Sequence, residues 1–312
     1  MQTILGSTGQ IGTELARVLR AQHTADIRLV SRRPRPIHDD DALLPADLLD
    51  PDQTRRAVAG SEVVYLTAGL PMDTAMWVDG WPRMMRHVID ACAEHGARLV
   101  FFDNTYMYPQ TAVPQSEDTP FQPSGEKGRV RAAIATQLLE AVRSGKVEAL
   151  IARAPEFYGP GQTQSITTTM VVDPLWNRKT AKVLLRDDTR RSLIFTPDAS
   201  RALALLGNTP DAYGQTWHLP VDTTRPTYRQ VVEVSADVFG VAARHRLVPR
   251  WQLALAGLFN KHARDAAELL PRYAVDNVFL DDKFRARFPD FKVTDLRTGM
   301  EQICAERRAI GA

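Results

Sequence analysis

The chain has 312 residues, 44% of them hydrophobic, which is enough to build one large domain, or a domain with a smaller lobe, around a substantial core. Its 39 Lys and Arg residues against 37 Asp and Glu leave a formal charge of +2, so no global field favours nucleic acid or an anionic membrane as a partner. The two cysteines, Cys92 and Cys304, form no CxxC pair, which argues against a disulfide framework and a thiolate metal site. With no room for a secretory leader after Met1 and no apolar run of about 18 residues, we expect a cytoplasmic protein.

The first half of the chain alternates short apolar runs with stretches of helical periodicity. The apolar and β-branched runs predict strands at residues 1–5, 27–30, 43–46, 63–67, 99–102 and 147–152. Helical spacing predicts a helix after the first strand and helices over 77–95 and 129–144, while Asp50 followed by Pro51 is typical of a helix start. This order predicts an α/β fold with a doubly wound parallel sheet of the Rossmann type.

The pattern loosens after Pro155, and the first domain is therefore assigned to residues 1–155. A predicted helix at 197–206 and a strand at 216–219 return residues 190–220 to the main sheet. The remaining segments, 156–189 and 221–312, are expected to form a smaller, mostly helical substrate-binding lobe.

A glycine-rich turn joins the first predicted strand to the first predicted helix. A GxxGxxG spacing supplies one glycine for the tight turn, one for close approach of the backbone to a pyrophosphate and one for contact between helix and strand. The helix N-terminus then offers free N–H groups to phosphates. We expect a dinucleotide at this turn rather than a connection that binds nothing; the turn comprises Gly6, Ser7, Thr8, Gly9, Gln10, Ile11 and Gly12.

The end of the second predicted strand indicates which dinucleotide binds. An acidic residue there holds the ribose 2′-hydroxyl of NAD, whereas arginine accommodates the 2′-phosphate of NADP. The chain instead reads Ser31-Arg32-Arg33-Pro34-Arg35, with no acid, which favours NADP(H) over NAD(H) and over a merely solvated basic loop. Asp47 and Leu48, after the third strand, are placed at the adenine, with an exposed Asp near a helix cap as the alternative for Asp47.

These motifs and several later ones resemble the extended short-chain dehydrogenase/reductase family, which includes NAD-dependent epimerases and dehydratases acting on nucleotide sugars. The resemblance covers most of the chain. It implies a Rossmann fold, a nicotinamide cofactor and a small-molecule substrate held between two lobes. Besides the glycine turn it depends on Asp47-Leu48, Thr67-Ala68-Gly69, Tyr106-Met107-Tyr108-Pro109, the stretch from Arg153 to Gly161, Thr196-Pro197-Asp198 and Trp217-His218-Leu219-Pro220.

The chain departs from the family at the catalytic positions. Family members usually carry a Tyr-x-x-x-Lys pair, whose tyrosine exchanges a proton with the substrate while the lysine contacts the nicotinamide ribose. The register of the resemblance places Lys127 at the tyrosine, Arg131 at the lysine and Asn104 at the usual hydroxyl. We assign Lys127 as the polarising or acid group, Arg131 as the ribose clamp and Asn104 as a substrate donor, against the alternative that both cations face solvent.

Four further residues are assigned to the substrate: Asp103, Tyr106, Tyr158 and Arg191. The alternative role of the two tyrosines is ordinary ring packing with local hydrogen bonds. The alternative for Arg191 is that it forms a solvated basic face with Arg186 and Arg190. No HExxH or Cys/His cluster supports a metal.

Two functions remain open from the sequence. The first is an atypical NADP(H)-dependent oxidoreductase or epimerase acting on a small polar or nucleotide-sugar substrate. The second is a catalytically inactive sensor or ligand-binding module that has kept the NADP(H) site. In both cases we expect no nucleic acid, membrane or metal partner, and the apolar stripes of helices 77–95 and 129–144 leave open a homodimer or simple core packing.

Overall fold

The computed structural model describes residues 1–161 and 165–311, which divide into two compact units. The first unit comprises Met1–Met107, Glu126–Arg153 and Ala199–Trp217. The second comprises Tyr108–Gly125, Ala154–Asp198 and His218–Ala312. It therefore includes residues 108–125, 154–155, 190–198 and 218–220, which the sequence analysis assigned to the first domain. The substrate-binding role of the second unit stays a prediction.

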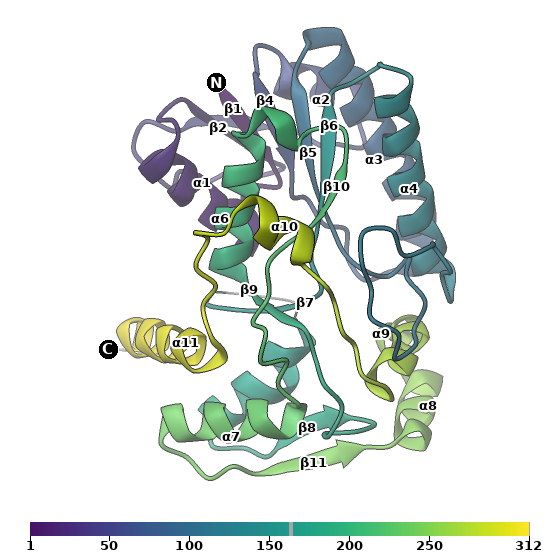
Figure 1. Cartoon of the computed structure of the whole chain (residues 1–312), viewed down its shortest axis with the longest axis vertical. Helices are drawn as coiled ribbons and strands as arrows, with labels where there is room; N and C mark the ends of the chain where they lie inside the picture. The colour runs from purple at the N-terminus through teal and green to yellow at the C-terminus, as the bar shows by residue number, and fades with distance from the viewer. Residues whose placement is uncertain (162–164, 312) are drawn as a thin grey trace. The chain divides into compact units, whose positions relative to one another are not determined.

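A seven-stranded sheet forms the centre of the first unit, in the order β10-β6-β5-β4-β1-β2-β3, and β1 to β6 pair in parallel (Figure 1). Buried apolar residues fill its central strands, as expected for a sheet covered on both faces. The predicted doubly wound parallel sheet is confirmed, with strand ends within three residues of those predicted. The strands are β1 (Gln2–Leu5), β2 (Ile27–Ser31), β3 (Ala42–Pro45), β4 (Val63–Leu66), β5 (Arg98–Asp103), β6 (Ala149–Arg153) and β10 (Thr216–His218).

Helices cover the sheet in two layers (Figure 1). In one layer, α2 (Pro51–Val58), α3 (Thr74–His95) and α4 (Glu126–Arg143) pack side by side. In the other, the Ser200 hydroxyl of α6 (Thr196–Gly207) donates to the carbonyl oxygen of Ile11 in α1 (Gln10–Gln22) at 3.1 Å. As predicted, Asp50 caps α2, because its carboxylate accepts from the backbone N–H of Gln53.

The apolar stripes of α3 and α4 are buried inside the first unit. Met85 and Val88 of α3 and Ile134 and Leu138 of α4 are fully buried. Core packing therefore accounts for these stripes, and a homodimer stays a prediction.

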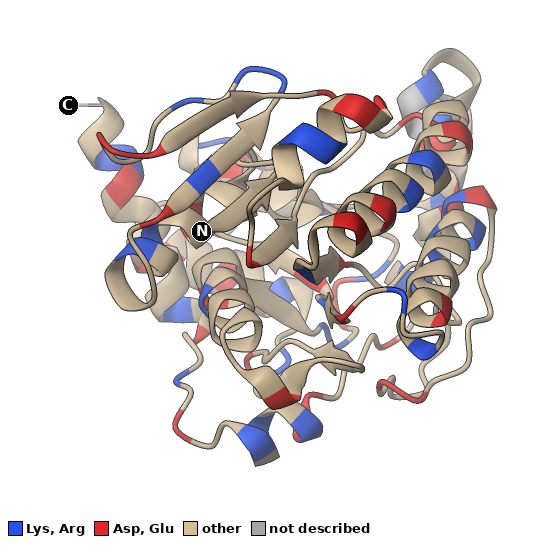
Figure 2. Ribbon diagram, turned by 90° about the horizontal axis from the view of Figure 1, so that it is seen from above, with Lys and Arg blue, Asp and Glu red and all other residues tan. Residues whose placement is uncertain are grey.

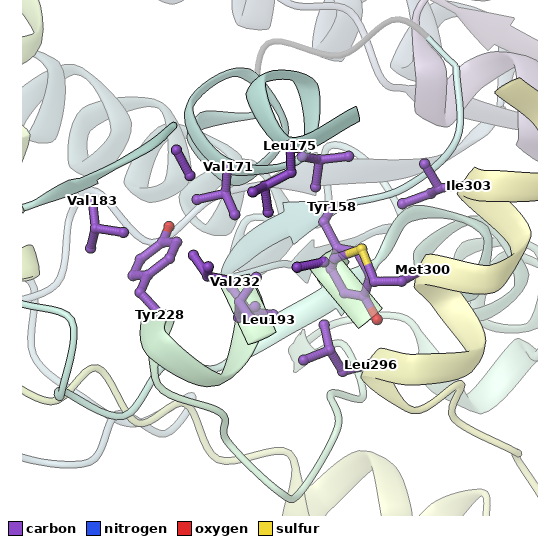
Figure 3. Packing of buried hydrophobic residues seen from close by; sticks show 14 of the residues in the cluster. Tyr158, Val171, Leu175, Val183, Leu193, Tyr228, Val232, Leu296, Met300 and Ile303 are labelled. Carbon is purple, nitrogen blue, oxygen red and sulfur yellow. The ribbon is translucent and has the colours of Figure 1, made fainter. Parts of the chain in front are cut away.

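The second unit combines two short parallel sheets with helices, and its C-terminal part is mostly helical, as predicted. The β7·β9 and β8·β11 pairs were not predicted, because one strand of each pair, β7 or β11, has no continuous buried apolar run. A buried apolar cluster joins them to helices (Figure 3). The elements are β7 (Glu156–Tyr158), η1 (Thr168–Val172), α5 (Asp173–Trp176), β8 (Ala181–Leu184), β9 (Leu193–Phe195), α7 (Tyr228–Phe239), β11 (His245–Val248), α8 (Arg250–Phe259), α9 (Lys261–Ala266), η3 (Ala267–Tyr273), α10 (Asp282–Arg287) and α11 (Leu296–Gly311), with η2 (Pro210–Ala212) in the first unit.

Charges of both signs are mixed along most helices, in keeping with the net charge of +2 (Figure 2). Among the described residues, no helix has the length and apolar character needed to cross a bilayer. In the same part of the chain, no three His, Cys, Asp or Glu side chains gather as a metal site would require.

Candidate functional site

The glycine turn lies at the carboxyl end of β1, where the sheet order reverses, since β2 lies on one side of β1 and β4 on the other. Ligands of open α/β sheets bind at such a switch point. Gly6 has a φ of +100°, and a Cβ there would lie 2.4 Å from the backbone nitrogen of Ala68. A Cβ at Gly12 would lie 2.6 Å from the carbonyl oxygen of Gly6. The turn thus needs glycine at both positions to bring its backbone against α1 and the end of β4.

The first turn of α1 is suited to an anion. Gly9 is the N-cap, no side chain caps this helix, and its first turn carries no acidic residue. Its N–H groups therefore keep the positive end of the helix dipole available for phosphate. Ser7 fixes the turn to β2, because its backbone N–H and its hydroxyl both donate to the carbonyl oxygen of Val30, at 3.1 and 3.2 Å.

Arg32 and Arg33 are exposed immediately beyond β2. The backbone N–H of Arg33 donates to the hydroxyl of Ser31 at 3.2 Å, which shapes the loop. Within residues 1–161 and 165–311, neither guanidinium forms an ion pair, although most other arginines of the first unit do. Two exposed cations without a carboxylate partner are available to a phosphate ester.

The residues predicted at the adenine and at the end of β4 lie around the same edge of the sheet. The Asp47 carboxylate accepts from the backbone N–H of Leu49 at 3.0 Å, and Leu48 is buried. The Thr67 hydroxyl donates to the carbonyl oxygen of Leu5 at 3.2 Å, which ties the end of β4 to β1. Ala68 packs against Gly6, as described above, and Gly69 is exposed.

Arg131 belongs to a buried ion cluster at the carboxyl end of β5. The Asp103 carboxylate accepts from Arg131 Nη1 at 3.3 Å and from Arg153 Nε at 3.2 Å. The same carboxylate accepts from the backbone N–H of Asn104 at 2.8 Å. All three charged side chains are buried, and one carboxylate between two guanidiniums leaves this cluster with a net positive charge. Asp103 is thus placed as an internal counter-ion of Arg131, the residue that the sequence analysis assigns to the lysine position.

Aromatic rings surround the guanidinium of Arg131. Its carbon lies 4.0 Å from the ring centre of Trp81 and 5.0 Å from that of Trp77, within the range of cation–π attraction. Burial lowers the pKa of Arg131, although Asp103 opposes this shift. Its Nε is buried and has no hydrogen-bond partner among the described residues, and the role of Arg131 as ribose clamp stays a prediction.

Lys127 is completely buried in the first turn of α4, and its Nζ donates to the Thr74 hydroxyl at 2.7 Å. Both cations of the α4 pair are therefore inside the protein, and the alternative that they face solvent is wrong. Lys127 is therefore a buried ammonium anchored to the neighbouring helix α3 through Thr74. Its catalytic role stays a prediction.

Asn104 and Tyr106 form the loop that follows β5. The Asn104 side-chain oxygen accepts from the backbone N–H of Tyr106 at 3.0 Å, and its Nδ2 has no partner in the part of the chain that is described. The Tyr106 ring stacks on Trp77, with ring centres 6.0 Å apart and planes 15° apart. Asn104 therefore keeps its donor, as the predicted substrate contact requires.

The comparisons with known proteins agree with this geometry. The sequence model of the NAD dependent epimerase/dehydratase family matches residues 3–219, which include the glycine turn, β4, β5 and α4. The chain belongs to this family. Ceramide reductase from Caulobacter vibrioides is 27% identical over 263 residues, which are 81% of this chain and 75% of that protein.

Solved epimerases share the fold. UDP-glucuronic acid 4-epimerase from Bacillus cereus, in complex with UDP-glucuronic acid and NAD, has a TM-score of 0.82 at 13% identity over 99% of this chain and 100% of that one. UDP-glucose 4-epimerase from Thermus thermophilus, in complex with NAD, has a TM-score of 0.76 at 15% identity, covering 99% of both chains.

Three predicted substrate residues of this family member lie in or near the core of the unit to which each belongs: Asp103, described above, Tyr158 and Arg191. Tyr158 is buried against Phe195, and among the described residues its hydroxyl has no hydrogen-bond partner. Tyr108, another tyrosine of the family-like motifs, shares a 2.7 Å hydrogen bond with His218 Nε2. Because His218 Nδ1 lies 2.8 Å from the carbonyl oxygen of Leu280 and must donate to it, Nε2 is the acceptor and the Tyr108 hydroxyl donates.

Arg191 is also buried, which contradicts the solvated alternative for this residue. It pairs with Glu156 at 3.2 Å, donates to the carbonyl oxygen of Arg272 at 2.6 Å and lies over the ring of Tyr273. Arg186 and Arg190 instead form exposed pairs with Asp188 and Asp276. The three arginines do not form one basic group.

Sequence reasoning missed the aromatic and hydroxyl residues of α3 that meet α4. Thr74, Trp77 and Trp81 contact Lys127 or Arg131, yet they are about 50 residues away in sequence. Their only signal was their place on a helix that follows β4 in a doubly wound fold. Arg153 was equally hidden, as the last residue of an apolar strand.

Proposed function

We propose that the chain is an NADP(H)-dependent oxidoreductase of the epimerase/dehydratase family that reduces a carbonyl group. The observation that carries the proposal is a combination of two features. The glycine turn has no room for a side chain at Gly6 or Gly12, and two exposed arginines without an ion-pair partner in the described residues follow β2. A bound nicotinamide would supply hydride chemistry, and the residues of the chain would bind and orient the dinucleotide.

The preference for the phosphorylated dinucleotide rests on Arg32 and Arg33. Each presents a planar guanidinium that matches a phosphate bidentately, and neither is neutralised by a carboxylate in the described residues. No acidic residue stands at the end of β2 to hold a ribose 2′-hydroxyl, since the strand ends on Ser31 and continues into arginines.

The reacting carbonyl would be polarised by Lys127. Its ammonium, oriented by Thr74, would donate to the carbonyl oxygen in place of a tyrosine hydroxyl, and Arg131 would contact the nicotinamide ribose. Asn104 Nδ2 would donate to a neighbouring substrate oxygen. Among small polar molecules we favour a nucleotide sugar, in line with the ligand of the B. cereus neighbour; the relative named ceramide reductase makes a ceramide-class lipid the second substrate to test.

Titration calorimetry with NADPH, NADP⁺, NADH and NAD⁺ tests the cofactor. We expect NADPH to bind most tightly and Arg32→Ala to weaken it by about 10–100-fold, because a hydrogen-bonded pair with a charged group contributes about 1.5–3 kcal/mol. NADH binding should change little. Arg17→Ala, an exposed arginine of α1, is the matched control. Equal affinities for NADPH and NADH, unchanged in Arg32→Ala, would overturn the preference.

Turnover tests the catalytic assignment. NADPH oxidation is followed with keto nucleotide sugars and with a keto lipid of the ceramide class. Lys127→Met should lower kcat by about 100-fold with little change in NADPH affinity, since a general acid contributes about 10²–10⁴-fold. Lys146→Met, at an exposed lysine, is the control. An unchanged kcat in Lys127→Met would remove Lys127 from the mechanism.

A second candidate function is a sensor that binds NADP(H) without turnover. The observation in its favour is that Asp103, Trp77 and Trp81 already engage Arg131, which limits the freedom of the predicted ribose clamp. A sensor would bind NADPH in calorimetry and show no oxidation with either substrate class.

A further inference from the structure

One segment of the second unit differs in charge from the rest of the chain. Between Asp237 and Asp265 the sequence contains no Asp or Glu, although the whole chain is almost neutral. The same segment contains five Lys and Arg residues: Arg244, Arg246, Arg250, Lys261 and Arg264. A local positive field is therefore present where the net charge of +2 shows none.

The helix in this segment, α8, exposes a large apolar face. Two residues mark the side of α8 that faces the protein. Leu253 packs against the core, and Gly257 is buried so close to α9 that a Cβ there would lie 3.5 Å from Arg264 Cα. On the opposite side Trp251 is 64%, Leu258 72% and Phe259 87% exposed. The helix thus has one apolar side against the protein and a second apolar side in water.

This exposure is concentrated. Of the ten large hydrophobic residues that are exposed in the described part of the chain, five lie within residues 247–259. Scattered apolar residues are normal on surfaces, whereas a group gathered on one helix indicates contact with another apolar phase. Four of the five lie on α8 and define its apolar face, namely Trp251, Leu255, Leu258 and Phe259, and Leu247 lies on the preceding strand β11.

Unpaired cations lie beside this face. In the β8·β11 sheet, Arg246 is directly opposite Lys182, so two like charges are neighbours, an arrangement that is unfavourable without an anion. Arg250 is the first residue of α8, whereas Arg178, Lys179 and Arg244 line a surface hollow with Asp237 at the opposite end of the β8·β11 sheet (Figure 1). In residues 1–161 and 165–311, none of Arg178, Lys179, Lys182, Arg244 and Arg250 forms an ion pair.

We propose that the α8 face docks on the surface of an anionic lipid bilayer, with Trp251, Leu258 and Phe259 in the interface and the neighbouring cations on lipid headgroups. An interfacial helix with an apolar side and flanking Lys and Arg binds membranes in this way. At ten residues α8 is about 15 Å long, well short of the ~30 Å hydrocarbon core, so it lies in the plane of the interface. The expectation of no membrane partner depended on the charge of the whole chain.

Two other occupants fit the observations less well. A nucleic acid would use the cations but would leave Leu258 and Phe259 in water. A second copy of the chain would bring the same unpaired cations against one another, because a two-fold interface pairs each patch with itself. An anionic bilayer satisfies both the charge and the apolar surface.

Flotation with lipid vesicles tests the proposal on the full chain. We expect binding to vesicles of phosphatidylcholine mixed with phosphatidylglycerol, weaker binding to phosphatidylcholine alone, and a bound fraction that falls with salt. Phe259→Asp and Arg250→Glu should each weaken partitioning by about tenfold or more, since the first removes a buried aromatic ring from the interface and the second reverses a charge that faces the anionic headgroups. Val113→Asp, an exposed apolar residue outside the face, should bind like the original chain.

Several results would overturn the proposal. They are absence of binding to anionic vesicles, equal binding to neutral ones, and unchanged binding in both face variants whose thermal midpoints match that of the original chain. A dimer that Phe259→Asp converts to a monomer would assign the face to a second copy. Binding of a nucleic-acid duplex that Arg250→Glu alone weakens would assign it to nucleic acid. NADPH affinity, measured in parallel, reports the cofactor site separately.

Discussion

Arg131 illustrates how burial changes the meaning of a substitution. Arginine and lysine carry the same charge, but only the planar guanidinium can lie over Trp81 and pair with Asp103 together. Arg131 is therefore matched to an aromatic environment in which a lysine would pack poorly. Its predicted role as ribose clamp would have to be performed from within the packing of α3 against α4.

Tyr158 gives a prediction that separates packing from binding. Its buried hydroxyl lacks a partner in the described residues, so Tyr158→Phe removes an unsatisfied polar group and should leave the free energy of unfolding unchanged or raise it by up to about 1 kcal/mol. Urea unfolding measures this. Turnover and substrate affinity should also stay unchanged; a rise in KM with intact stability would restore Tyr158 to the substrate site.

At the scale of elements, the glycine turn couples β1, α1 and β4. Gly12→Ala places a methyl group 2.6 Å from the backbone oxygen of Gly6, and a backbone atom cannot move aside as a flexible side chain can. We expect a loss of about 1–3 kcal/mol in stability and at least about tenfold in NADPH affinity. Chemical denaturation and calorimetry measure the two effects. Gly69→Ala, where nothing lies within 4 Å, is the stability control, and equal stability of both variants would contradict the crowding argument.

The loop after β8 gives an acid-dependent prediction. Arg229 and His245 lower the pKa of Asp187, with the Arg229 hydrogen bond as the largest cause. A carboxyl whose pKa is depressed on folding stabilises the protein above its unfolded pKa, near 3.9, and this contribution is lost as the pH falls through the folded value. Asp187→Asn should cost about 0.5–1 kcal/mol at pH 7, because Arg229 is largely exposed, and nothing at strongly acidic pH. The measurement is the thermal midpoint of the original chain and of Asp187→Asn across pH. A difference between the two midpoints that does not shrink at acidic pH would contradict the prediction.

At the scale of the whole molecule, cofactor binding should stabilise the folded chain by mass action. At about 100 times its Kd, NADPH should contribute about 2.7 kcal/mol, and the thermal midpoint should rise by several degrees. NADH at the same concentration should give a smaller rise, and Arg32→Ala should lose most of the NADPH effect. Equal shifts from the two dinucleotides would contradict the proposed preference.

The two units differ in how much of them the sequence revealed. Strands β1 to β6 were predictable because buried parallel strands are continuous apolar runs and their helices are periodic. Strands β7, β8, β9 and β11 were not predicted, since each pair includes a strand, β7 or β11, that is mostly outside the core and has no continuous apolar run. The acid-free segment before Asp265 was visible in the sequence, but its meaning depended on finding that α8 exposes apolar residues.

By itself the sequence determined the doubly wound fold, the glycine turn and the basic loop after β2, because each depends on residues adjacent in the chain whose conformations are local. Only the tertiary structure decided that Lys127 and Arg131 are buried, that Asp103 is the counter-ion of Arg131, and that Tyr158 and Arg191 belong to the interior. These facts arise from side chains separated by tens of residues that meet only when the chain packs. Burial and ion pairing are properties of that packing, and no local pattern encodes them.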